Sequence, residues 1–220
     1  MSQLFESWER EQEELRRLIR EAPCPCRFHK TSDVRTVAGI DASYIEGEEE
    51  AGGVVGISTL VVLRFPELEV IYTDEESMTE CPEYRSGFLY YREGPSAVTL
   101  LKRAEERGVS IDVAFVDGFG SLHPRGVGYA TQLGYVSNVA TVGVGKSLLE
   151  INGLNERRVK AQCREMLESS ACSGVVTLPL IDDRGVTVGA ALSGHASSVR
   201  PIYVSAGTCF PFSKKKRETS

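Results

Sequence analysis

Residues 37–44 read Val37-Ala38-Gly39-Ile40-Asp41-Ala42-Ser43-Tyr44. This apolar run predicts a β-strand that carries one carboxylate, Asp41. A carboxylate inside an apolar strand is costly unless it is paired or binds a metal. Asp41 is therefore the first candidate functional residue.

Two more strands are expected after this one, at residues 54–65 and 68–73, where β-branched and apolar residues dominate. Pro66 marks the break between them. Three strands joined by short turns predict an antiparallel meander.

The rest of the chain alternates between helical and strand patterns, which predicts parallel strands added to the meander. The expected fold class is α/β, with a mixed sheet flanked by helices. Helices are expected at 4–20, 96–107, 126–137 and 155–169, and strands at 113–117, 139–144, 175–180, 186–192 and 202–205.

The composition is that of a water-soluble globular protein. The chain has 220 residues, 41% hydrophobic and 25% charged, which suits one domain, expected at 1–207. No apolar run is long enough for a membrane span, and the polar N-terminus does not read as a signal peptide. We expect no membrane partner and a cytoplasmic or nuclear location. The net charge of −6 argues against a protein that coats nucleic acid, but it does not exclude a nuclease.

The six cysteines are scattered, and a chain of this length does not need disulfides, so reduced thiols are expected. Cys24-Pro25-Cys26 with His29 has the spacing of half a zinc site. Because no second Cys/His pair follows at ligand spacing, the sequence does not predict zinc there.

Two more acids join Asp41 as candidates. Asp117 ends the apolar strand at 113–117 and precedes a glycine, where open α/β sheets place ligands. Glu93 precedes Gly94-Pro95. Three acids from separate segments suit a hard cation such as Mg²⁺ or Mn²⁺. The competing interpretation is structural ion pairs, for example Asp41 with Arg92.

Four motifs surround these acids in a fixed order. They are Gly39-Ile40-Asp41-Ala42-Ser43-Tyr44, Tyr84-Arg85-Ser86-Gly87-Phe88-Leu89-Tyr90-Tyr91-Arg92-Glu93-Gly94-Pro95, Val116-Asp117-Gly118-Phe119-Gly120-Ser121-Leu122-His123-Pro124-Arg125, and Thr141-Val142-Gly143-Val144-Gly145-Lys146-Ser147-Leu148-Leu149. Together they resemble the endonuclease V family over roughly residues 8–207, and residues 60–70 resemble its eukaryotic branch.

The resemblance implies a ribonuclease H-like fold and a metal-dependent nuclease. The implied reaction hydrolyses a phosphodiester one nucleotide 3′ to a deaminated base, chiefly inosine, and leaves a 3′-hydroxyl and a 5′-phosphate. The bacterial branch acts on DNA and the animal branch favours inosine-containing RNA. The expected partner is therefore inosine-containing RNA, with DNA as a second substrate. The expected cofactor is Mg²⁺, for which Mn²⁺ substitutes, and the expected state is a monomer in the cytoplasm or nucleus, the nucleolus included.

The same resemblance assigns roles to single residues. Three acids would ligate the metal, a lysine and a histidine would act on the scissile phosphate or its water, and an aromatic wedge would fill the space of a flipped base. The lysine would otherwise be a solvated loop residue, and the histidine a packed one. These residues are Asp41, Glu93 and Asp117 for the metal, Lys146 and His123 for catalysis, Tyr84 as the wedge, Gly87, Leu89, Gly118 and Gly120 for the base pocket, and Arg125 for a phosphate.

Several positions depart from the family pattern. Glu83 stands where a proline precedes the wedge, and Gln132 stands where a histidine is typical. After Gly207 the family has an active-site histidine and a closing helix, whereas this chain continues with Thr208 and a basic segment. We expect 208–220 to be an atypical, disordered tail from a truncated or alternatively spliced product.

These departures leave three functional hypotheses. The first is an active inosine-specific endonuclease, and the second is a catalytically impaired isoform that binds inosine-containing RNA. The third is a ribonuclease H-like nuclease of another specificity, such as a junction resolvase.

Overall fold

The computed structural model describes residues 2–21, 30–44, 55–79, 81–169, 175–194 and 200–208. A short 3₁₀ helix at Thr31–Asp33 precedes the first strand. The helices are α1 (Ser2–Glu21), α2 (Leu89–Glu106), α3 (Tyr129–Ser137) and α4 (Glu156–Ser169). The strands are β1 (Thr36–Tyr44), β2 (Gly56–Arg64), β3 (Val70–Met78), β4 (Val113–Asp117), β5 (Ala140–Gly145), β6 (Val176–Ile181), β7 (Thr187–Ser193) and β8 (Ile202–Ala206).

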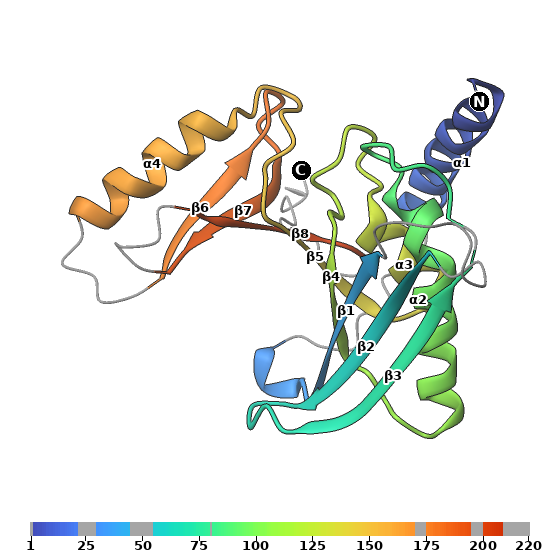
Figure 1. Ribbon diagram of the computed structural model, residues 1–220. Helices are drawn as coiled ribbons and strands as arrows, with labels where there is room; N and C mark the ends of the chain where they lie inside the picture. The colour runs from blue at the N-terminus through green and yellow to red at the C-terminus, as the bar shows by residue number, and fades with distance from the viewer. Residues whose placement is uncertain are drawn as a thin grey trace, which may run out of the picture.

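Within the described residues the strands form one eight-stranded sheet in the order β3-β2-β1-β4-β5-β8-β7-β6. The strands β1, β2 and β3 pair antiparallel, as the expected meander requires. The strands β1, β4 and β5 pair parallel. The strands β8, β7 and β6 complete the sheet with antiparallel pairs. The predicted mixed sheet flanked by helices is confirmed (Figure 1).

Two hydrophobic clusters hold the helices against the sheet. One lies between α2, α3 and the strands β1, β2 and β4, where Leu60, Val62 and Leu100 are fully buried. The other lies beneath α4 against β6 and β7, with Leu180 and Tyr203 at its centre. Figure 1 shows α4 at the opposite end of the sheet from α2 and α3.

Helix α2 begins earlier than the expected 96–107. Pro95 lies inside it, although proline lacks the N–H that the helix ladder uses. Glu93 and Gly94 are buried on the same face as Ala97 and Leu101, at helical spacing. This packing outweighs the local cost of the proline. Glu93 therefore projects from a helix rather than from a connecting loop.

Strand β3 is longer than the expected 68–73, because a cation from α2 neutralises the acids in its second half. The Arg103 guanidinium lies 2.8 Å from Asp74 and 2.7 Å from Glu76. The acids of this segment therefore sit on a paired strand.

Other expectations concern the cysteines, the tail and membrane segments. Cys81 and Cys163 are free thiols. The Cys24-Pro25-Cys26 segment, His29 and residues 209–220 lie outside the described residues. In the part of the chain that is described, no helix combines the length and apolar character needed to cross a bilayer.

Candidate functional site

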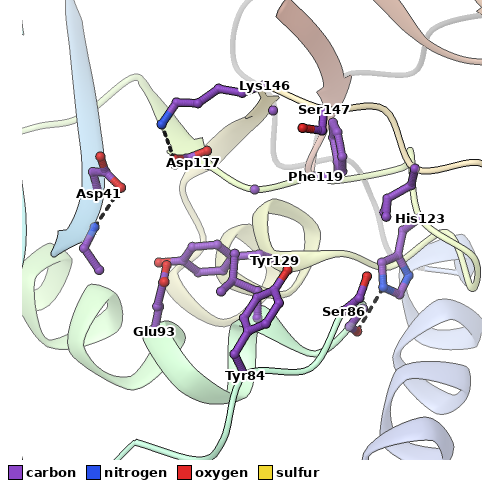
Figure 2. A pocket seen from close by; sticks show the side chains of 16 residues that line it. Asp41, Tyr84, Ser86, Glu93, Asp117, Phe119, His123, Tyr129, Lys146 and Ser147 are labelled. Atoms are coloured by element: carbon purple, nitrogen blue, oxygen red, sulfur yellow. Dashed lines mark hydrogen bonds and ion pairs between the residues drawn. The ribbon is translucent and has the colours of Figure 1, made fainter. Parts of the chain in front are cut away.

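A pocket with a volume of about 310 Å³ lies where β1, β4, β5, α2 and α3 meet. Figure 2 shows acidic, aromatic and basic side chains around it, from these elements and from the segments that connect them. Most of the predicted site residues line this pocket: Asp41, Tyr84, Gly87, Leu89, Glu93, Asp117, Gly118, His123 and Lys146.

The pairing of β1 with β4 brings two of the acids together. These strands run parallel, with Ile40 opposite Val116, so that Asp41 and Asp117 follow at matching positions. Glu93 reaches the same pocket from α2. The convergence expected for three acids from separate segments is present.

Glu93 is the most buried of the three carboxylates, with 7% of its surface exposed. Burial raises its pKa to about 7, and the negative charges of Asp41 and Asp117 contribute in the same direction. A hydrogen bond of 2.8 Å from the Tyr44 hydroxyl to Oε1 of Glu93 opposes this rise. The pocket therefore concentrates negative charge that a bound cation would stabilise.

The donor set fits a hard divalent cation because all three acids supply carboxylate oxygens. Among the described residues, the three carboxylates are not arranged as a cluster of metal ligands. The Asp41 carboxylate accepts a hydrogen bond from the Ala42 amide, and Asp117 contacts Lys146. Joint ligation therefore requires these side chains to turn into the pocket between them (Figure 2).

Lys146 follows β5 and forms an ion pair with Asp117, with 3.0 Å between Nζ and Oδ2. The lysine side chain is 80% exposed, so its ammonium group faces solvent at the pocket mouth. This hydrogen bond raises the pKa of Lys146, which keeps it positively charged.

The alternative prediction, that Asp41 forms an ion pair with Arg92, is wrong. Arg92 donates to the Pro82 carbonyl at 2.7 Å, and its guanidinium lies 4.1 Å from the centroid of the Tyr44 ring. Arg92 thus supports Tyr44 rather than Asp41.

His123 is buried in the pocket wall, with 4% of its surface exposed. Its Nε2 lies 3.0 Å from the Gly87 carbonyl, and its Nδ1 accepts the Arg125 amide at 3.3 Å. Burial lowers the pKa of His123 to about 4. A neutral ring protonated at Nε2 satisfies both contacts. His123 therefore holds the main chain, and contact with a phosphate would require it to release Gly87.

Two predicted substrate residues lie outside the pocket lining. Arg125 is bound to α1, through Gln12 and through Glu9 at 3.3 Å, and it also lies over the Phe88 ring. Gly120 packs against β8, where an added Cβ would stand 1.9 Å from the Ala206 carbonyl oxygen. The absence of a side chain there serves packing rather than ligand contact.

Gly118 does line the pocket, and space explains why it is glycine. A Cβ at this position would stand 2.8 Å from the Tyr129 ring and 3.2 Å from Leu89. A side chain here would occupy the pocket floor.

Tyr84 stands at the pocket rim with 64% of its surface exposed. Its neighbour Glu83 is also exposed. An exposed aromatic ring beside a pocket is available to stack on a planar ligand.

Two other departures, Gln132 and Thr208, are buried in the core. Thr208 is buried and donates to the Thr131 carbonyl at 3.1 Å. Gln132 is buried and donates to the Val127 carbonyl at 3.3 Å. Neither side chain is part of the pocket lining.

The sequence interpretation missed several functional neighbours. Tyr44 and Phe119 are part of the quoted motifs, but no role was assigned to them. Gln12 belongs to the helix expected at 4–20, for which the sequence suggested no functional role. A buried glutamine in an amphipathic helix can be identified only once its distant partners are known.

Comparison with known proteins agrees with this geometry. A sequence profile described as Endonuclease V matches residues 19–215. The chain belongs to the endonuclease V family. It is 36% identical to human Endonuclease V over 204 residues, which are 91% of this chain and 70% of the human protein. Its relatives are named as endonucleases, and the chain is accordingly an enzyme of the nuclease class.

Solved endonuclease V structures resemble the whole described fold. The catalytic domain of human Endonuclease V matches with a TM-score of 0.78 and 33% identity, covering 96% of this chain and 84% of the other. A Ciona intestinalis Endonuclease V, in complex with a 23mer DNA containing an inosine followed by a ribo-adenosine, matches with a TM-score of 0.79 and 30% identity. That match covers 94% of this chain and 84% of the other. The ribonuclease H-like fold expected for this family is confirmed.

Proposed function

We propose that this endonuclease V hydrolyses a phosphodiester bond one nucleotide 3′ to inosine, in RNA and secondarily in DNA, and leaves a 3′-hydroxyl and a 5′-phosphate. The observation that carries the proposal is the shared pocket, whose lining includes three carboxylates, Lys146 and the exposed Tyr84. The Ciona relative bound to inosine-containing DNA supports the choice of base.

Asp41, Glu93 and Asp117 would hold Mg²⁺, or Mn²⁺ in its place. Bound there, the ion would supply Lewis-acid stabilisation of a phosphoryl oxygen and a lowered pKa for water. Lys146 would stabilise negative charge on the scissile phosphate, and its ion pair with Asp117 supports this role.

Base recognition would use the opposite side of the pocket. Tyr84 would stack in the space left by a flipped base. Gly87, Gly118 and Leu89 would present main-chain groups and a small apolar surface to hypoxanthine. We further propose that the protein acts as a monomer in the cytoplasm or nucleus.

The test is cleavage of a single-inosine RNA in Mg²⁺, beside the same RNA with adenosine at that position. We expect one cut in the inosine strand only, abolished by EDTA and by Asp117→Ala. Mass spectrometry of the fragments identifies the position and the end groups. Equal cutting of inosine-free or branched substrates would instead identify another nuclease specificity.

The same experiment separates catalysis from binding alone. Retained binding with no cut beyond the Asp117→Ala background would support an inosine-RNA binder. The pocket lining supports catalysis, because it brings the three carboxylates and Lys146 together. Competition between matched inosine RNA and inosine DNA then measures the preference that the 2′-hydroxyl confers.

A further inference from the structure

Gln12 is a fully buried polar residue of α1, with 0% of its surface exposed. Its Nε2 donates to the Gly87 carbonyl at 3.0 Å, and its Oε1 accepts from Nε of Arg125. A buried amide is costly unless its polar atoms are satisfied. Both ends of Gln12 are satisfied by residues far along the chain, of which Gly87 belongs to the pocket lining.

The carbonyl that Gln12 binds belongs to a tight turn. The Phe88 amide donates to the Arg85 carbonyl at 3.0 Å, and Gly87 has a φ of +85° at the third position. A positive φ there is the requirement of a type II turn, which glycine meets. The Gly87 carbonyl lies within hydrogen-bond distance of two side-chain nitrogens, one from Gln12 and one from His123.

Aromatic contacts attach the rest of α1 to the same turn. The Arg85 guanidinium lies 4.1 Å from the centroid of the Phe5 ring. Trp8 stacks on Tyr91 with 4.4 Å between centroids and also contacts Phe88. Helix α1 therefore holds the turn at its first residue, at its glycine carbonyl and at its last residue.

The turn separates two residues that line the pocket. Tyr84 precedes it and Leu89 follows it. The geometry of the turn thus sets where the exposed ring stands relative to the pocket floor. Figure 2 shows Tyr84 and His123 on either side of this segment, next to Ser86.

We propose that Gln12 is a positioning residue for base recognition, and that it holds the Gly87 carbonyl so that Tyr84 and Leu89 frame the inosine. The inference rests on the proposed inosine specificity and assigns part of that specificity to α1. Gln12 lies outside the pocket lining, so it acts through the turn.

The sharpest variant is Gln12→Glu, which keeps an acceptor for Arg125 and replaces the donor to Gly87 with a carboxylate oxygen. Anisotropy with labelled RNA in EDTA gives the Kd for inosine and adenosine strands, with no strand cut. We expect the inosine preference to fall at least fivefold. Calorimetry with Mn²⁺ should give a metal affinity within twofold of the parent chain, because the carboxylates are untouched.

A second measurement follows the turn without substrate. Limited trypsin digestion, read by mass spectrometry, gives the rate of cleavage after Arg85. We expect this rate to rise at least fivefold in Gln12→Glu. The matched control is Glu9→Gln, which weakens the other α1 contact of Arg125 and leaves the Gly87 carbonyl bound. Glu9→Gln should change neither the inosine preference nor the rate of cleavage after Arg85.

A loss of inosine preference smaller than fivefold in Gln12→Glu overturns the inference. If Gln12→Glu does not fold, Gln12→Met takes its place. Methionine is similar in length but cannot form the two hydrogen bonds of Gln12, and the inosine preference should again fall at least fivefold. If the parent chain itself shows no inosine preference, the proposed function fails and this inference fails with it. The trypsin rate then still reports whether Gln12 holds the turn.

Discussion

The Tyr44 hydroxyl donates a hydrogen bond of 2.8 Å to Oε1 of Glu93. This contact ties the end of β1 to α2, so the strand that carries Asp41 also orients a second carboxylate of the pocket. The Arg92 guanidinium over the Tyr44 ring holds the phenol in place. The orientation of Glu93 therefore depends on a residue that is not itself a candidate ligand.

Replacing Tyr44 with phenylalanine should weaken Mn²⁺ binding several-fold, because Glu93 loses its orienting hydrogen bond and its pKa rises further. The stability loss should be about 1 kcal/mol. Calorimetry and urea unfolding measure the two effects. The matched control is Tyr72→Phe, since Tyr72 donates to Asp74 at 2.9 Å on β3. Equal effects of both variants on metal affinity would contradict a special role for Tyr44.

The raised pKa of Glu93 makes the stability of the metal-free protein depend on pH. The folded-state pKa is about 7 and the ordinary value is 4.5. The stability that this group contributes is present below pH 4.5 and is lost as pH rises through about 7. In EDTA at pH 8, Glu93→Gln should therefore be more stable than the parent chain by about 3 kcal/mol. At pH 4 the two should unfold at the same urea concentration, and a constant difference across pH would refute this.

The contribution of His123 to stability changes with pH in the opposite direction, over an overlapping range of pH. Its folded-state pKa is about 4, below the ordinary 6.5, so stability is lost as pH falls from about 6.5 to about 4. Relative to the parent chain, His123→Gln should become progressively more stable over that interval, by about 3 kcal/mol. Urea unfolding at several pH values tests this. No relative change between pH 7 and pH 4 would show that the ring is not buried in its neutral form.

Replacing Lys146 with glutamine should lower kcat by about 10²-fold or more, the size expected for loss of a charge at a developing anion. Thermal stability should hardly change, because exposed ion pairs contribute little. Lys160→Gln is the matched control, since Lys160 pairs with Glu156 at 3.0 Å on α4. It should retain full activity. A Lys146 variant with normal kcat would make this lysine a solvated loop residue.

Replacing Tyr84 with alanine should weaken binding of inosine RNA by about 1–3 kcal/mol, the value of one stacked base. Tyr84→Phe should bind normally, because the ring is retained. Tyr135→Ala is the control, since Tyr135 is exposed on α3 and outside the pocket lining. Anisotropy titrations compare the three. If Tyr84→Ala and Tyr135→Ala weakened RNA binding equally, the assignment of Tyr84 as the wedge would be wrong.

Much of the fold was predictable because strands and helices leave periodic patterns. The expected strand at 113–117 and the helix at 155–169 agree closely with β4 and α4. The start of α2 was missed because Pro95 is a local sign of a helix boundary. The burial of Glu93 and Gly94 becomes apparent only when the helix packs on the sheet. The length of β3 was missed because its acids are neutralised by Arg103 from another element.

By itself, the sequence determined which residues are candidates for the chemistry. Asp41, Asp117 and Lys146 stand in or just after apolar strand patterns, and the strands β1, β4 and β5 that precede or carry them pair parallel. Only the tertiary structure decided how these groups are supported. The bond from Tyr44 to Glu93 and the bond from Gln12 to Gly87 join residues 49 and 75 positions apart. Periodicity reports which side of an element is buried, but such contacts form only when separate elements pack together.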